Sequence, residues 1–425
     1  MKHVLHSAFS HSGQKCSATS LLLLDAEVYD DPEFKRMLID AVRSLRVGSA
    51  HDLASRVGPL IREPSGVLET ALKTLEPGES WAVMPRQVGD NARLWSPGVK
   101  YGVQPGGVTH RTEFFGPVLG VMRYERLADA IDMVNATGYG LTGAIHSLDE
   151  REIAQWKAGV QVGNLYINRG TTGAIVLRQP FGGMGLSSVG PGMKAGGPNY
   201  VACFMDFVDV ETDRPADRKA IENADLAALA GRFDVKQPEE ARLVRTMASY
   251  DRAWRAEFSR EHDHLRLLGQ DNIRRYLPWR EVLVRIEPND SLYEVFARVA
   301  AARVTGARVL ASYAPGTDEK LLDRLDAATE SWAAGIEIME ETDEELIAHI
   351  DAATLLRVRY AARERVGPEV RTAAAQRGHW IADVPVVGEG RVELLWYVRE
   401  QSISYDYHRY GNLGVRADEP RRAVE

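Results

Sequence analysis

Apolar residues follow two patterns along the chain, and each pattern predicts a different kind of element. At residues 32–45 they recur at intervals of three and four, which predicts an amphipathic helix. At residues 19–28 they cluster around Leu21-Leu22-Leu23-Leu24, which predicts a buried strand. The same patterns predict helices at 65–75 and 127–135 and strands at 81–84, 99–103, 116–122 and 161–168. Because strands and helices alternate, we expect a mixed α/β domain over residues 1–210.

The pattern changes after Asp209. Residues 211–240 are rich in charge and contain prolines, which is typical of a linker, here with one helix, and residues 241–264 suggest a longer charged helix. A second series then alternates strands at 281–286, 307–312, 336–339 and 355–360 with helices at 291–303, 318–332 and 343–350. Such a series predicts a right-handed parallel sheet, so we expect a second α/β domain over residues 241–425.

The end of this second domain is an apolar and aromatic ribbon, residues 392–411. Its composition predicts a strand or a hairpin. An exposed edge of this kind would aggregate, so we expect the ribbon to lie against another part of the protein.

One turn near the start of the chain carries the strongest chemical signal. We expect a helix over residues 3–12 that ends at Gly13, because glycine tolerates the left-handed conformation of a helix C-cap. Cys16 follows three residues later, and its polar neighbours are Ser12, Lys15 and Ser17. A cysteine that is fixed on a tight turn and reachable can act as a nucleophile through its thiolate. The alternative is a packed, inert cysteine.

Composition excludes several classes of function. The chain has 425 residues, 44% hydrophobic and 26% charged, which is ordinary for a soluble enzyme of two or three domains. A net charge of -8 gives no basic surface for nucleic acid. Two cysteines, Cys16 and Cys203, suit a reducing cytosol, and no apolar run has the length of a signal peptide or a membrane span. We therefore expect a cytoplasmic protein.

Histidines suggest no metal site. His3, His6 and His11 recur on the first predicted helix, but paired carboxylates or thiols are missing beside them. We expect no bound metal.

Three motifs occur in an order that resembles the aldehyde dehydrogenase superfamily. They are Phe9-x-x-x-Gly13-Gln14-x-Cys16, Glu113-Phe114-Phe115-Gly116-Pro117 and the segment from Asn168 to Gln179-Pro180-Phe181-Gly182-Gly183. The stretch Arg169-Gly170-Thr171-Thr172-Gly173-Ala174-Ile175-Val176 is similar to the L-glutamate γ-semialdehyde (1-pyrroline-5-carboxylate) dehydrogenase branch. The second half resembles the extra domain of long proline utilization A proteins. The resemblance implies an aldehyde dehydrogenase catalytic domain followed by a Rossmann-like α/β C-terminal domain.

The resemblance also implies a mechanism. Cys16 would attack the aldehyde to give a thiohemiacetal, hydride would leave for NAD, and water would hydrolyse the thioester. Glu113 and Phe115 match residues that hold the nicotinamide ribose and pack beside the nicotinamide. Taken alone, they would be an ordinary solvated glutamate beside a core phenylalanine.

The substrate site follows from the same resemblance. Ser17, Gly173 and Ala174 match the anchor for the substrate carboxylate, and backbone N–H groups with a hydroxyl make a suitable anion site. Phe181 would form a wall beside the aliphatic part of the substrate. The alternative for the loop of Gly173 is a plain connector.

The family places its NAD-binding domain, its general base and its side-chain oxyanion donor before the nucleophile, whereas only fifteen residues precede Cys16. We therefore expect these parts to be absent from this chain. Residues 299–312 resemble a helix–strand unit of the NAD-binding domain, but Ser312 stands where that domain has a nucleotide-binding lysine. The second domain is interpreted as a related fold that has lost cofactor binding.

Two hypotheses of different classes follow. In the first, the chain is the C-terminal part of an NAD-dependent L-glutamate γ-semialdehyde dehydrogenase of proline catabolism. It would act with the missing N-terminal half in cis or as a partner chain, with a proline dehydrogenase module or as a homo-oligomer. In the second, it is a catalytically silent piece with a structural, tunnel-sealing or oligomerising role.

Overall fold

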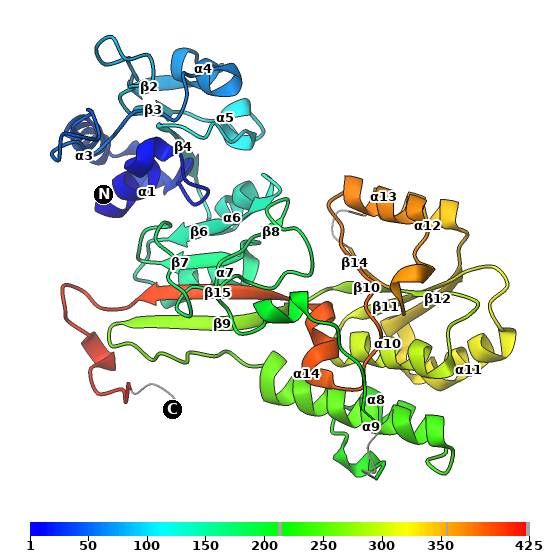
Figure 1. Cartoon of the computed structure of the whole chain (residues 1–425). Coiled ribbons are helices and arrows are strands. Elements are labelled where there is room, and N and C mark those ends of the chain that lie inside the picture. Colours follow the sequence, from blue (N-terminus) through cyan, green and yellow to red (C-terminus); the bar gives the residue numbers. More distant parts are fainter. Residues whose placement is uncertain (211–214, 354–355, 422–425) are drawn as a thin grey trace. The chain divides into compact units, whose positions relative to one another are not determined.

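The computed structural model describes residues 1–210, 215–353 and 356–421 (Figure 1). The chain divides into two compact units: unit 1 comprises Met1–Ile175, Arg266–Asp271 and Ile403–Glu425, and unit 2 comprises Val176–Leu265 and Asn272–Ser402. Both units contain helices and strands, which confirms the mixed α/β class. These units are divided at other residues than the expected domains at 1–210 and 241–425 and the expected linker at 211–240. The expected domains stay a prediction. Residues 211–214 of that linker and Leu355 of the predicted strand at 355–360 lie outside the described residues.

Unit 1 is built around a four-stranded sheet in the order β1-β4-β3-β2. Its strands are β1 Leu21–Asp25, β2 Ser80–Val83, β3 Gly98–Tyr101 and β4 Val118–Tyr124. Strand β4 pairs in parallel with β1 and β3, and β2 pairs antiparallel with β3. Helices α1 (Lys2–Phe9) and α3 (Pro32–Arg43) cover one face, where Phe9, Leu38 and Val42 are buried against Val99 and Leu119. This packing fixes the C-terminal end of α1, from which the cysteine turn departs.

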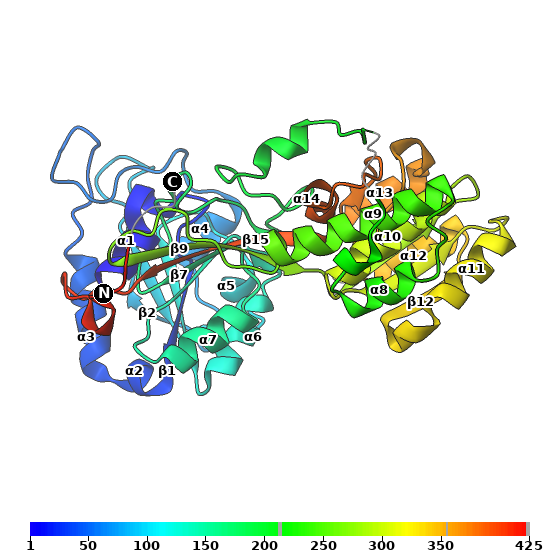
Figure 2. The same ribbon diagram turned by 90° about the horizontal axis from the view of Figure 1, so that it is seen from below.

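Several shorter elements complete unit 1. They are α2 Ala26–Asp30, α4 Gly66–Lys73, α5 Val108–Arg111, α6 Leu127–Asn135, α7 Glu150–Gly159, β5 Tyr139–Gly140, β6 Thr142–Ile145 and β7 Asn164–Ile167. Helices α6 and α7 lie side by side (Figure 2). A second sheet has the order β6-β7-β15-β9, and its long strands β9 (Gln270–Pro278) and β15 (Val398–Asp406) belong in part to each unit.

Element boundaries in unit 1 differ from the prediction by a few residues, and two of these differences have a clear local cause. The helix expected over residues 3–12 ends at Phe9, and His11, Ser12 and Gly13 all have left-handed φ angles of 54°, 57° and 71°. The strand expected over residues 19–28 ends at Asp25, because the Asp25 carboxylate accepts a hydrogen bond of 3.0 Å from the Glu27 N–H and caps helix α2. Both differences arise where the chain switches element within two or three residues.

Unit 2 contains a five-stranded sheet in the order β12-β11-β10-β13-β14. Its strands are β10 Glu281–Ile286, β11 Arg308–Tyr313, β12 Ile336–Glu340, β13 Arg357–Arg359 and β14 Ile381–Ala382. Every neighbouring pair is parallel, as the alternating series predicted. The helices of this unit are α8 Ala224–Ala230, α9 Pro238–Ala253, α10 Leu292–Val304, α11 Glu319–Thr329, α12 Asp343–Ala352, α13 Pro368–Gln376 and α14 Gly390–Glu393; β8 is Met184–Gly185.

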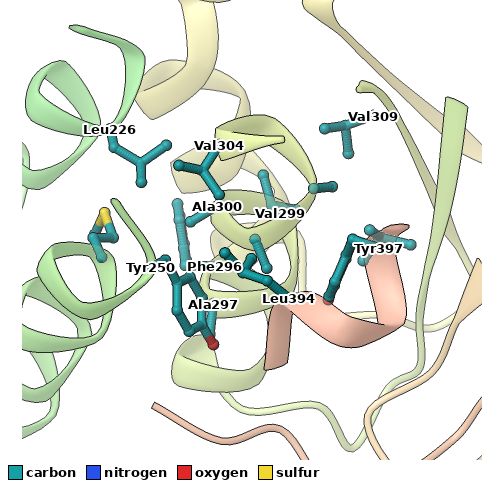
Figure 3. Close-up of a cluster of buried hydrophobic side chains, with 14 of the residues drawn as sticks. Leu226, Tyr250, Phe296, Ala297, Val299, Ala300, Val304, Val309, Leu394 and Tyr397 are labelled. Atoms are coloured by element: carbon teal, nitrogen blue, oxygen red, sulfur yellow. The ribbon is translucent and has the colours of Figure 1, made fainter. Parts of the chain in front are cut away.

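Alternate side chains of this sheet enter two separate cores. Val282 and Val284 of β10 pack with α8, α9, α10 and α11, whereas Leu283 between them packs with α12 and α13. Figure 3 shows side chains of the first core, among them Leu226, Tyr250, Phe296 and Leu394. Helix α8 lies within the predicted linker, where one helix was expected, yet Leu226 is fully buried. A parallel sheet covered on both faces is the arrangement that a strand–helix series favours.

The C-terminal ribbon is only partly a strand. Residues Leu394–Tyr397 form a 3-10 helix that follows α14, and the strand β15 begins at Val398. Strand β15 lies between β7 and β9, so its hydrogen-bonding edges are paired. The pattern did not predict β9, because the strand begins with three polar residues and its apolar residues are separated by two adjacent arginines, without a period of two.

Candidate active site

The turn that carries Cys16 begins with a close approach between two glycines. A Cβ atom added to Gly13 would lie 2.3 Å from the carbonyl oxygen of Gly116, so only glycine fits there. Its left-handed φ of 71° is also the conformation that glycine adopts without strain. Cys16 follows in a turn closed by a hydrogen bond of 3.0 Å from the Ala18 N–H to the Lys15 carbonyl, and its side chain is exposed. The thiol is therefore fixed and reachable.

Gln14 connects this turn to the second motif. Its side-chain amide donates a hydrogen bond of 3.0 Å to the carbonyl of Phe115, and its side-chain carbonyl accepts one of 3.0 Å from the Ile61 N–H. Ser12, predicted as a polar neighbour of the thiol, instead donates its hydroxyl to the Gly58 carbonyl at 2.6 Å and is buried. The structure thus brings Cys16 and the Glu113–Phe115 motif together through Gln14, whose role the sequence did not reveal.

Three hydroxyl groups connect the same turn to the third motif. The Thr171 hydroxyl donates to the Ser17 carbonyl at 2.8 Å and lies 3.0 Å from the Thr19 hydroxyl. The Thr171 N–H donates to the Ser7 hydroxyl at 3.1 Å, and the Ser7 carbonyl accepts from the Thr19 N–H at 3.0 Å. Gly170 adjoins this cluster, since an added Cβ would lie 2.8 Å from the Ser7 hydroxyl. Ser17 and the Gly173 loop are therefore neighbours.

The backbone of this third motif exposes two donors. Gly173 has a φ of 90°, and both Gly173 and Ala174 are exposed. Within the described residues, their backbone N–H groups and that of Cys16 donate to no acceptor. The segment before this loop is fixed at Asn168, whose side-chain amide donates a hydrogen bond of 2.9 Å to the Ser147 carbonyl. Such free donors on a fixed loop can bind an anion.

The second motif presents one polar and one apolar side chain to solvent. Glu113 is exposed, and partial burial nevertheless raises the pKa of its carboxyl group. Phe115 has a left-handed φ of 52° and is 43% exposed, whereas Phe114 is buried against Leu72 and Val118. Phe115 therefore combines a strained left-handed backbone with a partly exposed ring.

Residues 1–210 match the sequence model of the aldehyde dehydrogenase family. Residues 1–210 belong to the aldehyde dehydrogenase family. In this family domain, hydrogen bonds connect the turn of Cys16 to the other two motifs. Gln14 makes the connection to the second motif, and the hydroxyls of Ser7, Thr19 and Thr171 make the connection to the third.

Individual proteins are similar to this chain over stretches of different length. The chain is 32% identical over 407 residues to the bifunctional protein PutA of Salmonella typhimurium, which covers 88% of this chain and 29% of that protein. It is 36% identical over 205 residues to the 1-pyrroline-5-carboxylate dehydrogenase of Bacillus subtilis, and this match covers 48% of this chain and 39% of that protein. The structure of Proline Utilization A (PutA) from Corynebacterium freiburgense matches with a TM-score of 0.76 and 38% identity, covering 96% of this chain and 37% of that one. This chain spans well under half the length of these relatives.

One predicted site residue and the second cysteine lie outside the cluster of unit 1. Phe181, matched to the substrate wall, belongs to unit 2, where it pairs with Ala195. Cys203 also belongs to unit 2, and burial raises the pKa of its thiol. Cys16 is therefore the more accessible of the two thiols in the aldehyde dehydrogenase domain.

Neither a metal centre nor a membrane span emerges from the described residues. Within them, no three histidine, cysteine or acidic side chains are grouped so as to hold a metal ion. The ring of His3 instead packs at 5.3 Å from that of His146. Among the helices of the described part of the chain, none is both long and apolar enough to cross a membrane.

Proposed function

We propose that the chain takes part in the NAD-dependent oxidation of L-glutamate γ-semialdehyde to L-glutamate, the second step of proline catabolism, in the cytoplasm. The observation that carries this proposal is the turn of Cys16, which is hydrogen-bonded on one side to Phe115 and on the other to the loop of Gly173. The turn that carries the exposed thiol is thereby hydrogen-bonded to the loops proposed to hold the cofactor and the substrate carboxylate. The relatives named 1-pyrroline-5-carboxylate dehydrogenase and PutA support it.

The residues of this chain perform the covalent part of the chemistry. The Cys16 thiolate attacks the aldehyde carbon, and the Cys16 N–H donates a hydrogen bond to the oxygen as it becomes negative. The N–H groups of Gly173 and Ala174 and the Ser17 hydroxyl hold the carboxylate at the other end of the substrate. The attack gives a thiohemiacetal; once its hydride has left for the acceptor, water hydrolyses the thioester to the carboxylate and frees the thiol.

Glu113 and Phe115 fit the nicotinamide end of NAD. The exposed Glu113 carboxylate can accept hydrogen bonds from two ribose hydroxyls, and the partly exposed Phe115 ring can limit where the nicotinamide lies. When bound, NAD supplies the acceptor for the hydride. We propose that the rest of the NAD site, the general base and the side-chain oxyanion donor come from an N-terminal half in cis or in trans, with a proline dehydrogenase module as a further partner.

For unit 2 we propose a Rossmann-like fold that binds no nucleotide. Ser312, which replaces the lysine of the nucleotide-binding fold, is buried and accepts a hydrogen bond of 2.9 Å from Arg285. Arg285 is itself buried and also pairs with Glu287 at 2.9 Å and Asp343 at 3.0 Å. These ion pairs lie at the carboxyl end of β10, and open parallel sheets bind their ligands at this end of their strands. The ion pairs therefore support the proposal that unit 2 binds no nucleotide there.

Reconstitution tests the proposed reaction. We expect NAD reduction with glutamate semialdehyde when the chain is combined with the N-terminal half of a related dehydrogenase, and none by the chain alone. The Cys16→Ala variant is the control. A reconstituted enzyme that binds both ligands but reduces no NAD would instead favour the silent structural or oligomerising role.

A substitution at Ser17 tests the substrate. Charge-assisted hydrogen bonds contribute about 1.5–3 kcal/mol each, so Ser17→Ala should lower kcat/KM for glutamate semialdehyde by roughly tenfold or more. An aldehyde of similar length without the carboxylate should be nearly unaffected. Equal losses for both aldehydes would show that Ser17 supports Cys16 and does not read the carboxylate.

A further inference from the structure

A buried lysine contacts the motif that contains Phe181. Lys194 is 1% exposed, and its ammonium donates hydrogen bonds to the carbonyl of Gly183 at 2.8 Å and to that of Gly182. None of the described carboxylates forms an ion pair with it; the Lys194 backbone N–H, by contrast, donates to Glu400 at 2.7 Å. The side chain is therefore committed to two backbone carbonyls of one turn.

The turn itself depends on close packing. A Cβ atom added to Gly183 would lie 2.0 Å from the Ser187 carbonyl oxygen, and one added to Gly182 would lie 3.0 Å from the Lys194 side chain. Ala195 follows Lys194 in the chain. Its backbone exchanges two hydrogen bonds, of 2.9 and 3.0 Å, with the backbone of Phe181. Both the backbone and the side chain of the segment 194–195 thus hold residues 181–183.

We propose that Lys194 is a positioning residue that holds the turn Phe181–Gly183 and thereby sets the place of the Phe181 ring. Two inward carbonyls need two donors, and a lysine supplies them from one atom at the end of an apolar stem. The consequence for catalysis rests on the proposed function and on the family resemblance, which implies that Phe181 would form a wall beside the aliphatic part of the substrate.

The charge state of Lys194 does not interrupt this role. Burial lowers the pKa of its amine to about 7, with Glu400 raising it and Arg399 lowering it, and both of these charged groups lie on β15. The neutral amine still carries two N–H donors, so both carbonyls keep a partner in either form. Methionine has a stem of similar length and no donor, which makes it the informative replacement.

Hydrogen exchange tests the positional part on the full chain. The amides of Phe181 and Ala195 report the opening of the turn, because each donates to the other's carbonyl. In Lys194→Met we expect them to exchange at least about tenfold faster, while amides of the parallel sheet β10–β11 stay unchanged. The matched control is Lys320→Met, an exposed lysine of the same unit, which should change neither. Unchanged exchange at Phe181, or equal acceleration throughout unit 2, would overturn the proposal.

Kinetics of the reconstituted enzyme test the link to substrate. Lys194→Met should raise KM for glutamate semialdehyde with little change in kcat, and should add nothing in a Phe181→Ala background. Full additivity of the two substitutions would refute action through Phe181. If the reconstituted enzyme shows no activity, the proposed function fails, and the exchange experiment still decides whether Lys194 holds the turn.

Discussion

Single hydroxyl groups determine how the turn of Cys16 is held. Thr171 bonds to Ser17 and Thr19, whereas the hydroxyl of its neighbour Thr172 is buried and has no hydrogen-bond partner among the described residues. The two threonines are adjacent and equally buried, but only one of them contacts the turn of Cys16. This pair provides an internal comparison of a satisfied and an unsatisfied hydroxyl.

Thr171→Val should therefore destabilise unit 1 by about 1–3 kcal/mol, because the Ser17 carbonyl loses its donor. Thr172→Val should be neutral or stabilising, since it removes a buried hydroxyl without a partner. Native-state hydrogen exchange of strand β4 measures both changes. A larger loss for Thr172→Val would contradict the assignment of the hydrogen bonds.

The two thiols should differ in reactivity. Cys16 is exposed on its turn, while burial of Cys203 raises the pKa of that thiol and lowers its thiolate fraction. Iodoacetamide should modify Cys16 first in the folded chain, as peptide mapping would show. Cys16→Ala should abolish the fast phase; faster labelling of Cys203 would refute this prediction.

At the scale of elements, the step from α1 to β1 is set by a left-handed stretch. His11, Ser12 and Gly13 have positive φ angles in sequence, and the close approach of Gly13 to Gly116 fixes where the stretch ends. Non-glycine residues in this conformation are strained, and such strain persists only where surrounding contacts enforce it. The Ser12 and Gln14 hydrogen bonds are those contacts.

Gly13→Ala should be strongly destabilising for unit 1. The left-handed conformation alone costs an alanine about 1–2 kcal/mol. The control Gly89→Ala has a similar φ of 65° and no atom within 4 Å of the added Cβ, so it shows that cost alone. The clash with Gly116 should make the loss for Gly13→Ala clearly larger in thermal unfolding. Equal losses for both variants would contradict the close approach.

At the scale of the whole molecule, buried charge shapes the pH dependence of unit 2. Arg298 pairs with Asp290 and Arg359 pairs with Glu393, and all four side chains are almost wholly buried. Lys194 differs because no carboxylate in the described residues pairs with it, and burial lowers the pKa of its amine to about 7. The pKa of Lys194 is closer to neutral pH than those of Arg357 and Arg399 of the same unit, which burial lowers to about 9 and about 10.

The stability of unit 2 should rise with pH through this lysine. An unfolded lysine titrates near 10.4, so between about pH 7 and pH 10 the unfolded chain binds more protons than the folded one. The unfolding free energy then increases with pH in this range, and Lys194→Met lacks this contribution. Denaturation at about pH 6 and about pH 9 should show wild type gaining stability relative to the variant. A constant difference between them would contradict the lowered pKa.

The sequence by itself determined the elements whose signal is local. Helix α6 and strand β10 have the predicted bounds, because the periodicity of a buried face is written in consecutive residues. The parallel sheet followed from the order of its elements. The sequence also marked Cys16, Glu113 and the Gly173 loop through their motifs, and the catalytic roles of these residues stay predictions.

Only the tertiary structure decided how those motifs meet. Gln14 reaches Phe115 across 101 positions, and Thr171 reaches Ser17 across 154, so neither contact leaves a local pattern. The turn at Gly13 packs closely against Gly116, and β15 becomes an interior strand through pairing with β7 and β9. Local periodicity fixes which face of an element is buried, whereas the partner on that face is set by packing between distant segments.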